Sequence, residues 1–510
     1  MSFLRMKKYF ISILLALSCV IVQAETQNKI TLKTLLINFR ENILVKKNML
    51  SLQSAGADYK DSLTSLYPSV TAQAPVTVTD NFKTAGSYLG ADYTINNSTS
   101  FMISPELNLN QYLPTAGTLS LNVKNELSAS KTGSIDPEDL AEELGGTDNK
   151  YKNTPSIGIS VNQPLFFGDA YGAGKRIAEN TYNIAQHEFL LNQNNLVTAL
   201  LRDYFNLKYL NYSRILIKSR LADAEANYKS TEKMFKLGKT TNLELLKAKA
   251  ARMKAEIDLA DAELKYLSQR ADFFKKYGFK STAVIDTDIE NICDYSVLEN
   301  RDSITAEAMA SNISLAIKNY NLEIARDSLI NLKYIHAPVL NIYGNIAFST
   351  AADPDRDIYA ALHNSFNDNS NPVISAGITL SASIFDAGSL KDKTDKLNYQ
   401  ILIAGYAVKQ ERVGILSRLN ELFNKIEKNT KLAKYVELNN KIAELEYIKA
   451  EKDFKLGRIT QNDLNRLRME KENSKLSLLN NKIEANISYI DLLNLEGRNL
   501  LKYLTEKTEE

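Results

Sequence analysis

Few residues of this chain have the types and spacing that catalysis or metal binding requires. Its three histidines, His187, His336 and His363, are isolated, and no cysteine or carboxylate pair has the spacing of metal ligands. The run GDAYGAGKR (168–176) partly matches a phosphate-binding loop, but five residues separate its first and last glycines, and Arg176 stands where Ser or Thr should hold Mg²⁺. We therefore expect no enzymatic activity, no cofactor and no metal site.

Charged residues with regular spacing occur in a short stretch that is present twice. KMFKLGKTTNLELL, beginning at Lys233, recurs 219 positions later as KDFKLGRITQNDLN, with a glycine at the centre of each copy. Each copy places a threonine three residues before an acid, Thr241 before Glu244 and Thr460 before Asp463, which is the spacing of a helix capping box. Capping alone would explain the acids, and a second role for them is compatible with capping.

Long helices must position both copies. All ten prolines fall within 68–164 and 338–372, so that 165–337 and 373–510 contain none. Because proline breaks helix interiors, its absence over such lengths indicates very long helices, and apolar residues recur there every three or four positions. A helix over about 174–236 would be roughly 95 Å long at 1.5 Å per residue. Helices of this length pack as coiled coils or helical barrels.

The proline-bearing windows alternate apolar residues with small or polar ones. Six segments show this alternation: 67–80, 101–110, 118–128, 156–166, 339–349 and 373–385. Each has about the nine to eleven residues that a tilted strand needs to cross a bilayer. A soluble antiparallel sheet would show the same alternation, so both interpretations stand.

The 219-residue offset also relates longer parts of the chain, each with the order helix, strand, strand, long helix, tight turn and helix. We expect a first structural repeat at 25–278, a linker at 279–300, a second repeat at 301–497 and a C-terminal tail at 498–510. The expected outer strands and turns are 67–80, 156–166 and 237–241 in the first repeat, and 339–349, 373–385 and 456–460 in the second. The first repeat holds 51 more residues between its outer strands, which could form an extra hairpin or an external loop.

The N-terminus indicates that the chain is exported, and the overall charge limits the classes of partner that it can bind. Residues 1–24 have a basic start, an apolar run and small residues at the end, and we expect them to be a signal peptide, with Glu25 as the first mature residue. A lipidated Cys19 is the alternative. Without Arg5, Lys7 and Lys8 the chain has 59 basic and 60 acidic residues, so no basic excess indicates a nucleic-acid partner. Only one cysteine remains, so we expect no intrachain disulfide.

In this order, these features resemble the TolC-like outer-membrane efflux proteins over nearly the whole mature chain. The resemblance rests on the duplicated plan and on five motifs: NQPLFFGDAYGAGKR, SASIFDAGSLKDK, LTSLYPSV, YKSTEKMFKLGKTTNLELL and YIKAEKDFKLGRITQNDLN. It implies a mixed α and β fold and a homotrimer. Strands from three chains would close one outer-membrane β-barrel, which a long periplasmic α-helical barrel with coiled-coil packing would continue.

The implied function is that of an outer-membrane channel. It would be the exit duct of a tripartite efflux or type I secretion system, passively receiving cargo from a periplasmic membrane-fusion adaptor and an inner-membrane transporter of the resistance-nodulation-division or ABC type. Outer-membrane lipid would surround the strands, with aromatic residues such as Phe101, Tyr343 and Phe348 at its interfaces. The alternative is an exported coiled-coil structural protein or adhesin without channel activity.

A membrane-spanning barrel would need strands from several chains. Four or six strands cannot enclose a water-filled lumen, and open sheet edges are not tolerated in hydrocarbon. Three chains give twelve strands if the 51 additional residues form a loop, and eighteen if they form a hairpin in the wall. We expect twelve.

The resemblance makes the two repeated turns the periplasmic tips, where an adaptor docks and the channel is constricted. The docking residues would be Leu237, Gly238, Lys239, Thr240, Leu456, Gly457, Arg458 and Ile459. Glu244 and Asp463 fall where the family often has acids lining a closed aperture, and three copies of each would favour cations. Lys247 and Arg466 stand where some relatives have a second acid, and Ile459 replaces a basic aperture residue. The family's gating contacts therefore do not transfer directly.

Overall fold

The structure, a computed structural model, describes residues 29–64, 67–81, 86–88, 91–93, 97–133, 147–165, 169–278, 284–285, 289–335, 337–349 and 371–507. The expected signal peptide and Cys19 lie outside these residues. The chain forms two compact units. The helical unit comprises Met1–Gln53, Ile184–Asn319 and Ala407–Glu510, and the sheet unit comprises Ser54–Asn183 and Tyr320–Tyr406. Each unit therefore contains parts of both expected repeats.

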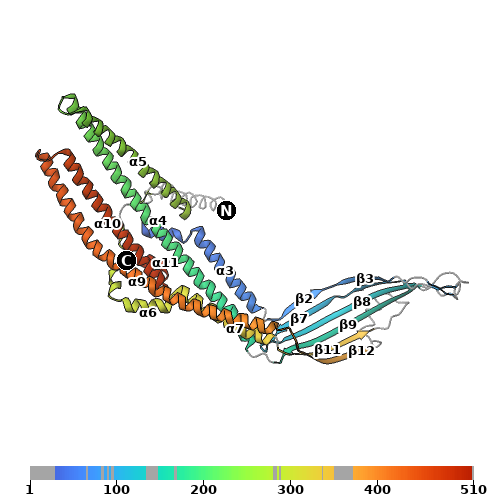
Figure 1. Cartoon of the computed structure of the whole chain (residues 1–510). Coiled ribbons are helices and arrows are strands. Elements are labelled where there is room, and N and C mark those ends of the chain that lie inside the picture. Colours follow the sequence, from blue (N-terminus) through green and yellow to red (C-terminus); the bar gives the residue numbers. More distant parts are fainter. Residues whose placement is uncertain are drawn as a thin grey trace, which may run out of the picture. The chain divides into compact units, whose positions relative to one another are not determined.

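Two long helical hairpins dominate the helical elements (Figure 1). Helices α4 (Ala170–Lys236) and α9 (Ser389–Lys455) have 67 residues each, and both of their ends are 219 positions apart. They are followed by α5 (Asn242–Tyr277) and α10 (Gln461–Leu495). The long helices that the absence of proline predicted are confirmed, and the first begins at Ala170, somewhat earlier than expected.

Shorter elements complete the helical part of the chain. They are α2 (Leu32–Phe39), α3 (Ile43–Thr64), α6 (Arg301–Ser311), α7 (Ile313–Ile335), α11 (Leu500–Lys507), the 3₁₀ helix η2 (Tyr295–Leu298), and the paired parallel strands β1 (Lys29–Ile30) and β10 (Val284–Ile285). Among the described helices, none is both long and apolar enough to cross a membrane.

The core of the helical unit gathers distant segments around α4. Phe39, Tyr204, Phe273 and Leu500, from α2, α4, α5 and α11, are all buried there. The segment expected as a C-terminal tail thus includes a helix that packs into this core. Lys208 is also buried, at 1% exposure, and its ammonium group donates to both carboxylate oxygens of Glu290 at 3.0 and 2.9 Å. A buried lysine is compatible with a core when it is paired in this way.

The sheet unit contains one large antiparallel sheet and a small separate hairpin. The large sheet consists of β2 (Ser69–Gln73), β3 (Val76–Asn81), β6 (Asn97–Ile103), β7 (Glu106–Tyr112), β8 (Thr118–Gly133), β9 (Thr147–Pro164), β11 (Val339–Ser349) and β12 (Asn371–Ser381). The small hairpin pairs β4 (Gly86–Tyr88) with β5 (Ala91–Tyr93). The mixed α and β fold is confirmed.

Four of these strands form two longer paths, each of which is interrupted by a proline and continues in the same register. Strand β12 pairs with β11, β11 with β9, and β9 with β8, after which β8 pairs with both β6 and β7. The pair β2 and β7 and the pair β3 and β6 share one register, which breaks only near Pro75 and Pro105. Because proline has no N–H to give to the ladder, β2 with β3 and β6 with β7 form two interrupted strands. The sheet therefore has six strand paths.

The expectation that the additional residues of the first repeat form an external loop is wrong. Strands β6, β7 and β8 lie within the same sheet, between the first strand path and β9. Strand β8 pairs with β9 along its whole length, from Thr118 opposite Asn162 to Gly133 opposite Thr147. Backbone pairing over such a length uses the polar groups that a loop would leave to water.

Candidate functional site

The first repeated stretch forms a tight turn between α4 and α5. Gly238 has a φ of 66°, in the left-handed region. The Lys239 N–H donates to the Met234 carbonyl at 2.8 Å, and the Gly238 N–H donates to the Phe235 carbonyl at 2.9 Å. These two bonds define a Schellman motif, in which glycine avoids the steric cost that a Cβ would bring.

The second repeated stretch forms the same turn between α9 and α10. Gly457 has a φ of 70°, the Arg458 N–H donates to the Asp453 carbonyl at 2.8 Å, and the Gly457 N–H donates to the Phe454 carbonyl at 2.9 Å. The turn is thus built twice with equal hydrogen-bond lengths. The central glycines are explained by backbone geometry.

The helix caps that follow the two turns differ. In the first, the Thr241 hydroxyl accepts from the Glu244 N–H at 3.3 Å, and the Glu244 carboxylate instead accepts from Lys247 at 2.9 Å. In the second, the Asp463 N–H donates to the Thr460 hydroxyl at 3.2 Å, and the Asp463 carboxylate accepts from the Thr460 N–H at 3.2 Å and its hydroxyl at 2.7 Å. Hydrogen bonds from Thr460 lower the pKa of Asp463. Only the second acid completes a capping box.

The basic residues of the tips are paired within their own helices. Lys247 pairs with Glu244, and Arg466 contacts Glu470 at 3.1 Å. Both pairs are exposed, so each contributes little to stability. Among the described residues, no hydrogen bond or ion pair joins the predicted aperture residues of one tip to those of the other, so each tip forms a separate charged group.

Each turn also exposes a large apolar side chain beside its glycine. Leu237 is 70% exposed and Leu456 is 65% exposed. Thr240 and Ile459, the last predicted docking residues of each turn, are half-buried. An apolar residue presented on a rigid turn has little conformational freedom to lose on binding, which favours a contact with another protein.

A polar cluster that the sequence did not reveal links the two hairpins within the helical unit. Arg468 of α10 donates to the Asp223 carboxylate of α4 and, at 3.1 Å, to the Tyr447 hydroxyl of α9. Glu472 lies one turn from Arg468, and one of its carboxylate oxygens is buried without a hydrogen-bond partner. Burial raises the pKa of both Asp223 and Glu472. Tyr447 belongs to the repeated segment, but Asp223 lies 245 positions from Arg468, and no spacing in the sequence could have indicated that pair.

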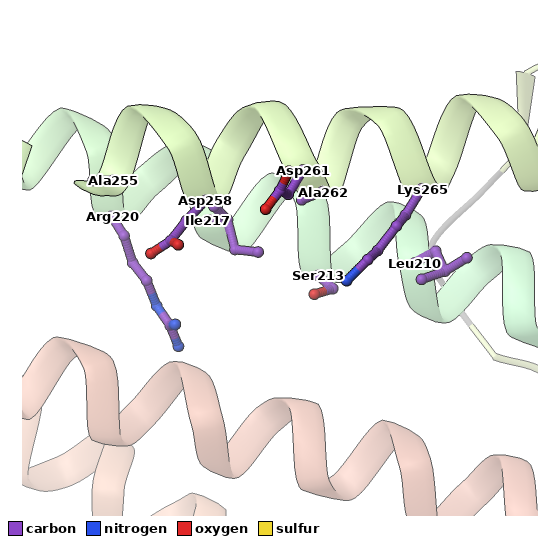
Figure 2. A pocket seen from close by; sticks show the side chains of 9 residues that line it. All are labelled: Leu210, Ser213, Ile217, Arg220, Ala255, Asp258, Asp261, Ala262 and Lys265. Carbon is purple, nitrogen blue, oxygen red and sulfur yellow. The ribbon is translucent and has the colours of Figure 1, made fainter. Parts of the chain in front are cut away.

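A groove of about 380 Å³ lies between α4 and α5 (Figure 2). It is lined by Leu210, Ser213, Ile217, Arg220, Ala255, Asp258, Asp261, Ala262 and Lys265. Figure 2 shows the Arg220 side chain extending away from α5, and its guanidinium donates to the Asn473 side chain of α10 at 2.6 Å. The lining mixes two acids with two bases, and the described residues contain no group that could hold a metal ion.

Apolar residues at coiled-coil spacing remain exposed on two helices of the helical unit. On α5 they alternate at intervals of three and four: Leu246, Ala250, Met253, Ile257, Ala260, Leu264 and Leu267. On α9 a similar exposed run is formed by Tyr435, Leu438, Ile442 and Leu445. Such seams are stable in water only when another helix covers them.

The large sheet has one apolar face and one polar face. A row that crosses all six strand paths on the apolar face consists of Ala72, Leu107, Val123, Ile157, Ile346 and Ile374. The next row, on the opposite face, consists of Thr71, Asn108, Asn122, Gly158, Asn345 and Ser375. Phe101 and Phe348 lie on the apolar face, whereas Tyr343 lies on the polar face and packs where a side chain at Gly377 would stand.

The apolar face is exposed, and its exposure is greatest at the two open edges. Val78 on β3 and Ile374 on β12 are 66% and 73% exposed, whereas Ile346 on the interior strand β11 is 41% exposed. A continuous exposed apolar surface of this kind marks a membrane or protein contact. The two unpaired edges leave backbone groups that need partners in an apolar environment.

Among the residues first considered for enzymatic chemistry, Arg176 has structural partners. In the sheet unit, Arg176 donates to both carboxylate oxygens of Asp327, at 2.6 to 3.2 Å, and to Asp169 at 2.6 Å, and these bonds raise its pKa. Its donors are therefore engaged by carboxylates. Cys293 is a buried free thiol whose pKa burial raises to about 12. His336 and His363 lie outside the described residues.

Comparison with known proteins relates this chain to a family and to several solved structures. Residues 126–276 match the family described as outer membrane efflux protein. No curated protein matches the chain by sequence.

The solved structures share the fold at low sequence identity. The outer membrane protein VceC of Vibrio cholerae has a TM-score of 0.63 at 13% identity, with 91% of this chain and 96% of that chain covered. The CmeC outer membrane channel of Campylobacter jejuni has a TM-score of 0.62 at 12% identity, with 93% and 88% covered. CusC has a TM-score of 0.62 at 12% identity, with 93% and 92% covered. The fold thus extends over nearly the whole chain.

Proposed function

From the match to the outer membrane efflux proteins and a fold shared with solved outer membrane channels, we propose that this protein is an outer-membrane channel. The sheet unit spans the outer membrane, and the helical unit extends into the periplasm. The channel is the passive exit duct of a tripartite efflux or type I secretion system. The observation that carries the proposal is the two-faced sheet with two open edges.

The faces of the sheet match the two environments of a channel wall. The apolar row through Leu107 and Ile346 faces lipid, while the amide row through Asn108 and Asn345 faces a water-filled lumen. A single sheet with free edges at β3 and β12 cannot close by itself. Because hydrocarbon does not tolerate unpaired backbone, copies of this chain complete the wall, as three copies do in the family that the sequence resembles.

The helical unit supports the same assembly. The exposed seams on α5 and α9 differ in position, so a seam on one copy can pack against a seam on the next around a ring. Coiled-coil packing between copies would cover apolar residues such as Ile257 and Leu438, which a single chain leaves exposed.

The tips dock a periplasmic membrane-fusion adaptor, which connects the channel to an inner-membrane transporter. Leu237 and Leu456 are the apolar contacts, and Lys239 and Arg458 beside them provide polar ones. Two equivalent turns per chain give six similar docking sites in a trimer.

The aperture carries the acids Glu244 and Asp463 together with the bases Lys247 and Arg466. Lys247 pairs with Glu244 and Arg466 pairs with Glu470, whereas the Asp463 carboxylate is bonded to the neutral Thr460, so the ring keeps a weak preference for cations. We expect Glu244→Gln with Asp463→Asn to lower the cation-to-anion permeability ratio, and Lys247→Met with Arg466→Met to raise it. Reversal potentials in a salt gradient measure both.

Purified protein in a planar bilayer tests the channel proposal. A detergent-stable trimer that conducts ions supports it. A protein that remains soluble without detergent, is monomeric or dimeric and does not conduct would contradict it and would favour a coiled-coil structural protein or adhesin.

Crosslinking in cells tests the partner. Cysteines at Lys239 and Arg458, modified with a photoreactive reagent, should capture one periplasmic protein. A cysteine at Glu263, which is exposed on α5 away from the turn, is the matched control and should not capture it. Equal capture at all three positions would contradict docking at the tips.

A further inference from the structure

The inserted strands of the first half form a substantial part of the large sheet. Between the first strand path and β9, the chain adds the path of β6 and β7 and the strand β8, whereas β11 and β12 are neighbours in the second half. The sheet thus has four strand paths from the first half and two from the second.

The inserted strands have the same two faces as the rest of the sheet. Leu109 and Leu121 lie opposite each other on the apolar face, and Asn108 and Asn122 lie opposite each other on the polar face. The Asn122 amide donates to the Asn108 side-chain oxygen at 2.5 Å. The neighbouring row continues the apolar face through Val123 to the next strand. A hairpin with water on both of its faces would not be expected to align its apolar residues with those of the membrane-spanning strands.

The apolar band on β8 also has the height of a membrane. It runs from Leu119 to Ala129 through Leu121, Val123 and Leu127, and Asn125 is the one polar residue in this alternating series. Eleven residues of a strand tilted by about 40° rise roughly 25 Å, which is about the height of the lipid-facing band of outer-membrane barrels.

We propose that the inserted hairpin is part of the channel wall, so that each chain contributes six strands and a ring of three chains closes an eighteen-stranded pore. This inference rests on the proposed channel function. With strands about 4.8 Å apart and tilted by about 40°, twelve strands give a backbone diameter of about 24 Å and eighteen give about 36 Å. The wider pore is lined by hydroxyl and amide side chains together with Glu106, Lys124 and Glu126, and this mixed lining admits bulky hydrated cargo of either charge.

Each ring contact then joins two different edges. The free edge of β12 in one copy pairs with the β2 and β3 edge of the next, because these are the two unpaired edges of the described sheet. Such a head-to-tail contact closes a ring when the curvature allows it. The occupant of each edge is a second copy of this chain.

Environment-sensitive labelling tests the position of the hairpin. A fluorescent label is attached to single cysteines replacing Leu121 or Asn122 on β8, and replacing Ile342 or Asn341 on β11 as the matched pair. Cys293 remains in place, because its buried thiol has a raised pKa and does not compete for the label. The protein is reconstituted in vesicles and quenched either by lipid-attached nitroxides or by a water-soluble quencher.

The label at Leu121 should be quenched by lipid nitroxide as strongly as the label at Ile342, and the labels at Asn122 and Asn341 only by the aqueous quencher. If β11 shows this two-sided pattern and both β8 positions respond only to the aqueous quencher, the hairpin lies outside the wall and the inference is wrong while the channel stands. If Ile342 itself does not contact lipid, the proposed channel function fails.

Pore size provides a second readout. Deleting Asn97–Gly133 removes the inserted strands and leaves the antiparallel order of the remaining four. The cross-section at the outer end should fall to about 45% of its original value, following the square of the strand number. The largest polyethylene glycol that enters from the outer side should become correspondingly smaller. An unchanged size limit in a conducting deletion variant would overturn the proposal. If the variant does not fold, the labelling result decides.

Discussion

The two halves of the chain build the same helical hairpin but differ in what surrounds it. Helices α4 and α9 have equal lengths, and the turns after them have equal hydrogen-bond lengths. The halves differ in their charged contacts: Arg468 of α10 joins a partly buried polar cluster, whereas Lys249, at the corresponding position of α5, is exposed. They also differ in the sheet, to which the first half gives twice as many strand paths.

This comparison separates what the turn requires from what varies around it. The central glycine and the capping threonine occur in both halves because the backbone needs a left-handed residue and a helix cap. The acids after the caps and the basic residues further along have different partners in each half. Backbone geometry is therefore shared between the tips, while their electrostatics are specific to each tip.

The largest expected difference between the halves comes from Arg468→Met. The substitution leaves the partly buried Asp223 carboxylate without its paired cation and removes one of the two arginines that act on Glu472, and we expect it to destabilise the contact between hairpins by about 2 kcal/mol. Lys249→Met, the matched change in α5, should have almost no effect because that side chain is exposed. Hydrogen exchange of peptides from α10 and α5 measures both, and equal effects would show that the cluster does not distinguish the halves.

The glycines should instead behave alike. Gly238→Val and Gly457→Val each place a β-branched residue in a left-handed conformation, and we expect each to destabilise its hairpin by about 1–2 kcal/mol. Asparagine, which tolerates this conformation better, should cost less at both positions. Amide exchange in the last turns of α4 and α9 reports the loss. A large effect at only one glycine would mean that the two turns are not equivalent in solution.

The caps should separate the halves again, by a smaller amount. Asp463→Ala removes the return bond to Thr460 and should destabilise the start of α10 measurably, by less than the glycine substitutions do. Glu244→Ala removes only an exposed pair with Lys247 and should cost a few tenths of a kcal/mol at the start of α5. Exchange protection of the first turns of α5 and α10 tests this order, and a reversed order would contradict the two cap geometries.

Much of the helical architecture could be predicted from the sequence because its signals are local. The absence of proline and the periodic apolar residues predicted α4 and α9, and the pair of Gly238 and Gly457 predicted the turns. The capping hypothesis held fully at Thr460 and only in part at Thr241, because a shared spacing does not decide which partner the acid selects.

The remaining features depend on contacts between distant segments. The alternation of 101–110 and 118–128 indicated strands, but only the pairing of β6 and β7 with β8, and of β8 with β9, places them in the main sheet. The bond between Arg468 and Asp223 joins residues 245 positions apart, for which no periodicity gives a signal. The fate of the 51 additional residues was predicted wrongly for the same reason: sequence length alone does not distinguish a loop from a paired hairpin.

The smallest expected difference is in the response to pH, and it again arises from the partly buried polar cluster around Arg468. The pKa of Asp223 and of Glu472 is raised in the folded chain, so the folded state binds protons more tightly than the unfolded state. Their burial therefore reduces stability above the folded pKa values, and this loss is relieved as the pH falls from neutral toward the ordinary carboxyl range. Asp463 has a lowered pKa and acts in the opposite direction, since its contribution is lost only at pH values below that range.

Protection of α10 against hydrogen exchange, corrected for the intrinsic rate, should thus rise modestly between pH 7 and pH 5, and Glu472→Gln should flatten the rise. The corresponding residue of the first half is Met253, so the same measurement on α5 should show no such rise. A rise of equal size in both helices, or one that Glu472→Gln leaves unchanged, would assign the pH response to groups outside this cluster.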